Sequence, residues 1–323
     1  MANIAIVGAT GLVGKTMLEA LDNYDIKIDN LILYASEKSA GKTIDFKGKT
    51  YTVRALNTDI DETLDYALFS AGHFVSKTYA PKFRNKGIKV IDNSSAFRQD
   101  ETTPLIVPEV NAQAISQSSL IANPNCSTIQ AMLPLHVIKK LYGITHIQYV
   151  TLQAVSGAGY QGLEGLKHDG AFTDEHAIKD NVIPKIDVFD DEFNAYEEVK
   201  MIQESKKILN DQTINISATC IRVPVSHAHG VNITVQTKQK PDLTVLKETL
   251  KSFQGITFYE HPTYPTPQDA RGKDDVLVGR LRYDNSKENS IHLWTVADNI
   301  KKGAATNAVQ ILKQLMEENH ETI

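Results

Sequence analysis

Ile4-Ala5-Ile6-Val7, followed at once by Gly8-Ala9-Thr10-Gly11-Leu12-Val13-Gly14, is the stretch that decides the fold of the N-terminal half. The apolar run has the length of a buried strand, and residues 15–21 continue at helical spacing. A glycine turn between a strand and a helix lets backbone N–H groups and the helix N-terminus hold a pyrophosphate. The spacing departs from the commoner G-x-G-x-x-G, so an ordinary tight turn stays open as the alternative.

Short apolar runs repeat the first pattern along the next hundred residues, at 31–35, 66–70, 88–92 and 119–122. Residues 75–85 have a helix-like composition. Strands that alternate with helices predict a mostly parallel sheet with both faces covered.

Longer runs rich in Ile, Val, Thr and Tyr follow, at residues 144–155, 214–225, 231–237, 276–281 and 291–296. Long strands with few intervening helices predict a larger mixed or antiparallel sheet. Helical patterns are present in this half too, at 128–141, where Pro134 should perturb the helix, and at 194–209 and 243–253. Residues 157–191 are mostly polar.

The predicted fold class is α/β with two domains. An Asn-Pro dipeptide interrupts the pattern near residues 123–127, and we place the boundary there. A Rossmann-like dinucleotide-binding domain takes residues 1–126 together with the C-terminal helix, residues 304–323. An α+β catalytic domain with a mixed sheet takes residues 127–303.

Composition excludes several classes of protein. The 323 residues carry a net charge of -5 and no long basic run, which argues against nucleic acid or an anionic membrane as a partner. No apolar stretch is long enough to span a membrane, and the N-terminus lacks a signal-peptide pattern, so we expect a soluble, cytoplasmic protein. Two distant cysteines argue against a disulfide framework or a cysteine-based metal site, and we expect no metal.

Ser36-Glu37-Lys38-Ser39 follows the second strand, where a dinucleotide would present its adenosine ribose. Lys38 and the two hydroxyls suit the 2'-phosphate of NADP, whereas Glu37 could accept a hydrogen bond from the free 2'-hydroxyl of NAD. We favour NADP, because a cation with two small donors makes a phosphate pocket. A solvated loop would explain the same residues.

Cys126 lies between a predicted strand and a predicted helix, in Asn123-Pro-Asn-Cys-Ser-Thr128. The positive end of a helix dipole lowers the pKa of a thiol placed there, which favours a nucleophile. Cys220 lies inside a strand pattern and is interpreted as a buried small residue.

Two further segments fall near predicted strand ends. Arg222, His227 and His229 come near one sheet end, and the planar fork of Arg222 makes it a candidate carboxylate clamp. Arg98 follows Asn93, Ser94 and Ser95 after another strand, which resembles an anion cradle.

Seven segments together resemble aspartate-semialdehyde dehydrogenase, most closely the Gram-positive type, from end to end of the chain. They occur in the order seen in that family: Gly8-Ala-Thr-Gly-Leu-Val-Gly14, Asp92-Asn-Ser-Ser-Ala-Phe-Arg98, Val107-Pro-Glu-Val-Asn111, Asn123-Pro-Asn-Cys-Ser-Thr128, Gln153-Ala-Val-Ser-Gly-Ala-Gly159, Arg222-Val-Pro-Val followed by His229, and Asp298-Asn-Ile-Lys-Lys-Gly-Ala-Ala305.

The resemblance implies NADP-dependent interconversion of 4-aspartyl phosphate and aspartate 4-semialdehyde with phosphate, on the route to lysine, diaminopimelate, threonine and methionine. It implies a homodimer that associates through the second domain, to which the polar segment 160–200 would contribute. The implied site has three parts: Cys126 as nucleophile, His229 as acid-base group and Gln153 as a positioning residue; Arg222 with Glu197 for the carboxylate and amine of the substrate; and Arg98, Asn125 and Lys200 for phosphate. The implied NADP contacts are Gly8, Thr10, Gly11, Leu12, Val13, Ser36, Lys38, Ser39, Ser70, Ala71, Gly72, Ser156, Gly157 and Asn299.

Some residues depart from the family pattern. Gly230 and Val231 replace the usual polar pair after His229, and His227 competes with His229 for the acid-base role; the seven-residue spacing from Arg222 favours His229. On spacing alone, Glu197 and Lys200 would be an exposed i,i+3 pair on a helix. The alternatives are N-acetyl-glutamyl-phosphate reductase, in which a glycine normally stands where this chain has Asn125, a non-catalytic dinucleotide-binding protein, and a cysteine hydrolase.

Overall fold

The computed structural model describes residues 1–57, 60, 63–115, 118–167 and 176–321. The chain forms two compact units, Met1–Pro124 with Ala304–Ile323, and Asn125–Gly303. The boundary between them lies two residues before the end of the predicted first domain. Among the described residues, no helix is both long and apolar enough to cross a membrane.

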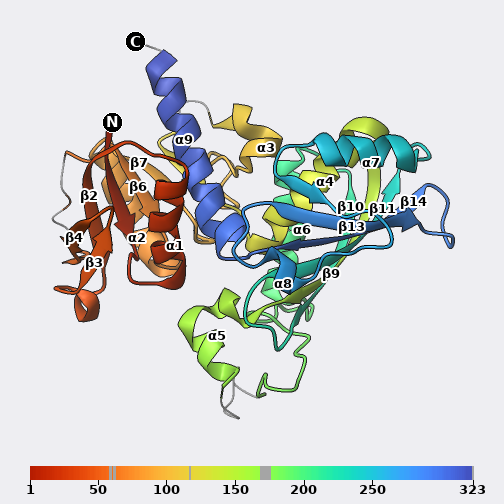
Figure 1. Ribbon diagram of the computed structural model, residues 1–323, viewed down its shortest axis with the longest axis horizontal. Coiled ribbons are helices and arrows are strands. Elements are labelled where there is room, and N and C mark those ends of the chain that lie inside the picture. The colour runs from red at the N-terminus through yellow and green to blue at the C-terminus, as the bar shows by residue number, and fades with distance from the viewer. Residues whose placement is uncertain (58–59, 61–62, 116–117, 168–175, 322–323) are drawn as a thin grey trace. The chain divides into compact units, whose positions relative to one another are not determined.

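The first unit is built on a six-stranded sheet in the order β5-β2-β1-β6-β7-β8, and all five neighbouring pairs are parallel (Figure 1). Its strands are β1 Ala2–Val7, β2 Ile28–Ala35, β5 Arg54–Ala55, β6 Tyr66–Phe69, β7 Lys89–Asp92 and β8 Leu120–Ala122. The parallel sheet predicted from the alternating pattern is confirmed.

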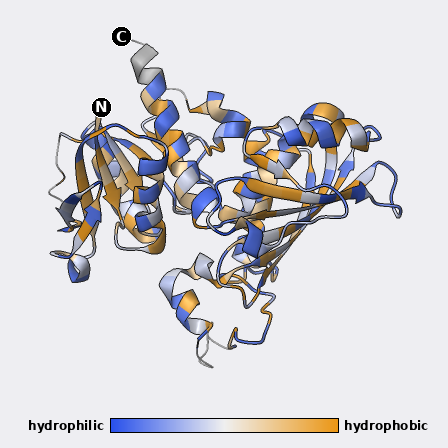
Figure 2. Ribbon diagram, viewed as in Figure 1, coloured by the Kyte–Doolittle hydropathy of each residue, from blue (hydrophilic) through white to orange (hydrophobic). Residues whose placement is uncertain are grey.

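Consecutive residues of β1 enter different cores on the two faces of this sheet. Ile4 and Ile6 join a cluster with α1 (Leu12–Asn23) and α9 (Thr306–Glu321), whereas Ala5 and Val7 join one with α2 (His73–Asn85). Burial on both faces is why the strand is a continuous apolar run rather than an alternating one. The strands of this sheet are accordingly drawn largely in the hydrophobic colour in Figure 2.

The predicted pattern has no counterpart for strand β5 or helix α3 (Pro108–Asn111), nor for a hairpin of β3 (Thr43–Phe46) and β4 (Lys49–Thr52). Lys47 and Gly48 form its turn with φ values of 49° and 73°. Positive φ at both turn residues matches the twist of two antiparallel strands.

The second unit contains a mixed six-stranded sheet in the order β10-β9-β11-β14-β13-β12, as the long β-rich runs predicted. The outer pairs β10-β9 and β12-β13 are parallel and the three inner pairs are antiparallel. The strands are β9 Ile144–Gln153, β10 Asn215–Arg222, β11 His229–Thr237, β12 Ile256–Phe258, β13 Val276–Tyr283 and β14 Ser290–Ala297.

Helix α4 (Cys126–Tyr142) packs against this sheet and contacts α6 (Tyr196–Ile208) and α7 (Leu243–Ser252). It continues through Pro134, so the perturbation predicted there does not end the helix. A run of eight buried residues, Ser127 to Pro134, shows that tertiary packing holds α4 in place around the missing backbone donor. The short helices α5 and α8 take Gly159–Gly165 and Pro267–Ala270.

Candidate active site

The glycine loop lies at the carboxyl edge of the parallel sheet, directly after β1. Gly8 has φ +92°, and a Cβ added to it would lie 2.4 Å from the carbonyl oxygen of Ser70. A Cβ on Gly14 would lie 2.2 Å from the carbonyl oxygen of Gly8. Gly11 is the N-cap of α1 and, as a glycine, has no side chain to cap the helix. The two crowded glycines let the loop fold tightly against a helix N-terminus, the kind of helix end whose N–H groups bind anions.

Two other predicted cofactor segments reach the same edge. Ser70, Ala71 and Gly72 follow β6, which pairs in parallel with β1, and Gly72 with φ +84° is the N-cap of α2. Ser36, Lys38 and Ser39 follow β2, the other parallel neighbour of β1, where Glu37–Ser39 forms a short 3-10 helix. Loops after adjacent parallel strands converge at one sheet end, which is where dinucleotides bind in such sheets.

Arg98 follows β7 at this edge and is largely buried. Its guanidinium donates to the backbone carbonyls of Asn123 and Asn93, each at 2.9 Å. Asp92 nearby accepts from the hydroxyls of Ser76 and Ser94 at 2.6 and 2.7 Å, and burial nevertheless raises its pKa. The Asp92 to Arg98 segment is therefore a hydrogen-bonded loop that fixes the arginine.

In the second unit, three predicted residues lie at one end of the mixed sheet. Gln153 and Arg222 are the last residues of the parallel strands β9 and β10 and are direct register partners. His229 is the first residue of β11, which runs antiparallel to β9. Residues far apart in sequence thus meet because two strands end where the third begins.

Cys126 is the first residue of α4, which begins two residues before the predicted start at 128, and its predicted place at a helix N-terminus is confirmed. Asn125 is the N-cap: its side-chain oxygen accepts from the N–H groups of Ser127 and Thr128 at 2.9 and 3.4 Å. Its side-chain nitrogen donates to Glu197 Oε1 at 2.7 Å. The thiol therefore lies at a capped helix N-terminus, where the helix dipole favours a negative charge.

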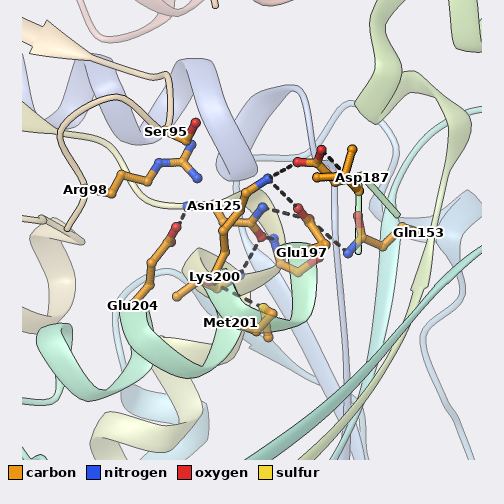
Figure 3. Close-up of polar contacts among 12 residues, drawn as sticks. Ser95, Arg98, Asn125, Gln153, Asp187, Glu197, Lys200, Met201 and Glu204 are labelled. Carbon is orange, nitrogen blue, oxygen red and sulfur yellow. Dashed lines mark hydrogen bonds and ion pairs between the residues drawn. The ribbon is translucent and has the colours of Figure 1, made fainter. Parts of the chain in front are cut away.

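Glu197 connects most of the predicted substrate residues (Figure 3). It accepts from Asn125 and from Gln153 Nε2, the latter at 3.2 Å, and pairs with Lys200 Nζ at 3.2 Å. Burial opposes the charge of this carboxylate, but Lys200, the two amides and Arg222 outweigh it and lower the pKa. Glu197 is only 5% exposed, so its ion pair with Lys200 is not the exposed surface pair that spacing alone would indicate.

His229 is fully buried and contacts the main chain of Ala154. Its Nδ1 accepts from the Ala154 N–H at 2.9 Å, while Arg222 Nη1 donates to the Ala154 carbonyl at 2.7 Å. Nε2 is buried and has no hydrogen-bond partner among the residues that the structure describes. Burial first, and then the charge of Arg222, hold the His229 pKa well below its ordinary value. The ring is therefore neutral and presents Nε2 for a reacting group.

Gly157 lies against both of these side chains, since an added Cβ would be 2.9 Å from Arg222 Nη1 and 3.5 Å from His229 Nε2. Ser156 Oγ donates to Asn299 Oδ1 at 3.1 Å, which also accepts from the Ala228 N–H. These three predicted cofactor residues belong to the second unit, whereas the others belong to the first.

Gly230, the departure from the family pattern beside His229, has a steric explanation. A Cβ there would lie 2.1 Å from the ring of Trp294, whose Nε1 is anchored to the carbonyl of Pro265 at 2.9 Å. Glycine is required because Trp294 occupies the space of a side chain. His227 is half-buried, and burial and Arg271 lower its pKa.

Comparison with known proteins tests the resemblance directly. Residues 3–118 match the model of a semialdehyde dehydrogenase NAD binding domain, and residues 133–302 match that of a semialdehyde dehydrogenase dimerisation domain. An aspartate-semialdehyde dehydrogenase from Aquifex aeolicus is 45% identical, with 98% of each chain covered. One from Bacillus subtilis is 42% identical at the same coverage.

The chain belongs to the aspartate-semialdehyde dehydrogenase family. Among solved structures, aspartate semialdehyde dehydrogenase II from Vibrio cholerae complexed with ASA superimposes with a TM-score of 0.96, at 43% identity over 98% of both chains. Similarity of this extent over both units confirms the predicted family and fold class, an NAD(P)-binding unit followed by a unit with a mixed sheet.

Two residues that contact the loop around Cys126 were not recognised from the spacing of residues in the sequence. Gly303 packs against the nucleophile candidate: an added Cβ would lie 2.8 Å from Cys126 Cβ. Glu204 is fully buried and accepts from the Asn125 N–H at 2.6 Å. Gly303 lies in the Asp298–Ala305 segment that resembles the family, and Glu204 continues the helical spacing of Glu197 and Lys200. Neither pattern indicates that the residue contacts the loop around Cys126.

Proposed function

We propose that this chain interconverts 4-aspartyl phosphate and aspartate 4-semialdehyde with phosphate, using NADP and a thioacyl intermediate on Cys126. The observation that carries the proposal is the hydrogen-bonded group around Glu197, which joins the helix end bearing Cys126 to the strand ends bearing Gln153 and Arg222. It places a thiol, an anion, cations and a neutral imidazole within one unit.

In the biosynthetic direction the Cys126 thiolate attacks the acyl carbon of aspartyl phosphate. The new carbon–sulfur bond replaces the carbon–oxygen bond to phosphate, which leaves with its electron pair. The thiolate suits this step because it attacks readily and yields an acyl group that is reactive toward hydride. Lys200, Asn125 and Arg98 are the residues assigned to phosphate, and their cation and amide donors offset its charge.

Glu197 and Arg222 would hold the two charged ends of the amino acid. The lowered pKa of Glu197 keeps it anionic, which suits the ammonium group, and the guanidinium of Arg222 suits the carboxylate. His229 would donate a hydrogen bond from Nε2 to the carbonyl oxygen when hydride addition to the thioester makes the carbon tetrahedral and the oxygen anionic. The oxygen's electron pair then re-forms the carbonyl, the carbon–sulfur bond breaks, and the aldehyde and the Cys126 thiolate are released.

The glycine loop fits a nicotinamide dinucleotide. Because Gly8 and Gly14 have no Cβ, the loop packs closely at the start of α1. The N–H groups of that helix end would hold the pyrophosphate. Bound NADP would supply or accept the hydride. Lys38, Ser36 and Ser39 support a preference for NADP, because donors that follow β2, two of them exposed and Ser39 half-buried, suit its 2'-phosphate.

The test is a reaction of the purified protein with aspartate semialdehyde, phosphate and NADP, followed by nicotinamide absorbance. We expect phosphate-dependent NADPH formation that disappears in Cys126→Ala. Cys220→Ala is the matched control, because that cysteine is fully buried and should leave turnover near wild type.

Parallel reactions separate the alternatives. Reduction with N-acetyl-glutamate semialdehyde in place of aspartate semialdehyde would favour the related reductase. Binding of NADP without reduction by either aldehyde would favour a non-catalytic dinucleotide-binding protein. Either result would overturn the proposed reaction.

We also propose a homodimer formed through the open face of the mixed sheet. Helix α4 packs against the sheet above buried residues such as Val231 and Ile233, while alternate residues along the same strands are only half-buried. Val150, Asn232 and Trp294 form one row of this other face, as register partners on β9, β11 and β14. The family's dimerisation domain contains all three. The predicted contribution of residues 160–200 includes 168–175, which lie outside the described residues.

Light scattering of Val150→Arg tests the interface. A charge in the row should shift a dimer toward monomer, because it would be buried without a partner. Val245→Arg on α7 is the control, since Val245 is 49% exposed on another element. A Val150→Arg variant that remains as dimeric as the control would exclude this face.

A further inference from the structure

Glu204 is a buried acidic residue for which the proposed reaction has no use. It lies on α6 one and two turns beyond Lys200 and Glu197, on the helix face that meets the start of α4 (Figure 3). Its side chain is fully buried, although a buried carboxyl group is costly unless hydrogen bonds compensate. Such a residue is retained for a contact that it makes.

One contact of Glu204 is with the backbone N–H of the residue immediately before the cysteine. Glu204 Oε2 accepts from the Asn125 N–H at 2.6 Å. At many helix N-termini, an acid three residues into the same helix binds the N-cap N–H. In α4 that position is Thr128, whose hydroxyl instead donates to Met201 Sδ at 3.4 Å. The acid of the capping arrangement is therefore supplied by a neighbouring helix.

Asn125 is consequently held on both sides of its α-carbon. Its N–H is bound by Glu204, its side-chain oxygen caps α4, and its side-chain nitrogen is bound by Glu197. We propose that Glu204 is a positioning residue that fixes the residue before Cys126, and thereby the place of the thiol at the start of α4. This inference rests on the nucleophilic role proposed for Cys126.

Two conservative variants separate the reach of the side chain from its charge. Glu204→Gln keeps an acceptor oxygen at the same distance but removes the charge. Glu204→Asp keeps the carboxyl group but shortens the side chain by one methylene, so the oxygen no longer reaches the Asn125 N–H. Glu198→Asp is the matched control on the same helix: Glu198 also accepts backbone N–H groups, those of Ala195 and Cys220.

The first measurement is the rate of alkylation of Cys126 by iodoacetamide, with the modified residue identified by mass spectrometry. This rate needs no turnover, so it tests the placement of the thiol even if the proposed reaction fails. We expect Glu204→Asp to react about tenfold more slowly, because a loosened N-cap withdraws the helix N–H groups that favour the thiolate. Glu204→Gln should react at close to the wild-type rate.

The second measurement is kcat and KM in the phosphate-dependent oxidation of aspartate semialdehyde, with thermal unfolding recorded for each variant. For Glu204→Asp we expect about a tenfold loss in kcat with little change in KM, since misplacement of a reacting atom affects the chemical step more than binding. Alkylation and kcat at wild-type levels in Glu204→Asp would overturn the proposal. Equal defects in Glu204→Gln, or in Glu198→Asp, would also overturn it, because charge or general helix stability would then be the cause.

Discussion

Gly303→Ala should lower kcat, because the added methyl group would displace Cys126. The Cβ would lie 2.8 Å from Cys126 Cβ and 3.2 Å from its Cα, whereas ordinary contacts begin at 3.4 Å. One of the two residues must therefore move by about 0.6 Å, the difference between 3.4 and 2.8 Å. A displacement of 1 Å at a reacting group can cost about 100-fold in rate, so we expect about a tenfold loss in kcat, or about 1.4 kcal/mol.

The assay is steady-state oxidation of aspartate semialdehyde, together with the rate of Cys126 alkylation and the unfolding midpoint. Gly279→Ala is the control, because its added Cβ would also lie 2.8 Å from a neighbour, here Pro265 Cδ, in the same unit. Overpacking costs about 1–3 kcal/mol of stability in either place. A normal kcat and alkylation rate in Gly303→Ala, or an equal kcat loss in Gly279→Ala, would refute the reasoning.

Three further predictions concern other parts of the site. His229→Ala should lower kcat far more than His227→Ala in the same assay, and comparable losses would contradict the assignment of the acid-base group. Lys38→Ala should lower the ratio of kcat/KM for NADP to that for NAD, and an unchanged ratio would show that Lys38 does not select the cofactor. His229 has a lowered pKa in the folded protein, so below about pH 6.5 its side chain binds a proton in the unfolded chain but not in the folded one. The free energy of unfolding therefore falls as pH falls, by up to about 1.4 kcal/mol per pH unit. Urea unfolding between pH 6.5 and 5 should therefore show a smaller loss in His229→Asn than in wild type; Glu197, whose pKa is lowered from 4.5, contributes only below this range.

Parts of the site could be predicted because strand ends are visible in the sequence. Arg222 and His229 were placed near one sheet end because they fall close to the facing ends of the predicted runs 214–225 and 231–237, and strand pairing brings such ends to one edge. Gln153 was assigned from the family resemblance. The glycine loop was visible for the same reason, since a tight strand-to-helix turn requires glycine at Gly8.

Other parts could not be predicted, because they depend on which helices pack together. Glu197 and Lys200 have the spacing of an exposed ion pair, and only the packing of α6 against α4 buries Glu197 beside Asn125. From the sequence, Gly230 is only a departure from the residue usual in the family. The structure shows that the Trp294 ring fills the space that a side chain at position 230 would need.

The sequence by itself determined the family, the alternation of strands and helices that makes the parallel sheet of the first unit, and the residue types able to form and reduce a thioacyl group. These depend on local periodicity and on motifs whose residues are close in the chain. The tertiary structure alone decided the neutral state of His229, the burial of Glu197, and the contacts of Glu204 and Gly303 with the cysteine loop. Burial and long-range contacts set pKa values and positions, and neither can be read from residues that lie tens of positions apart.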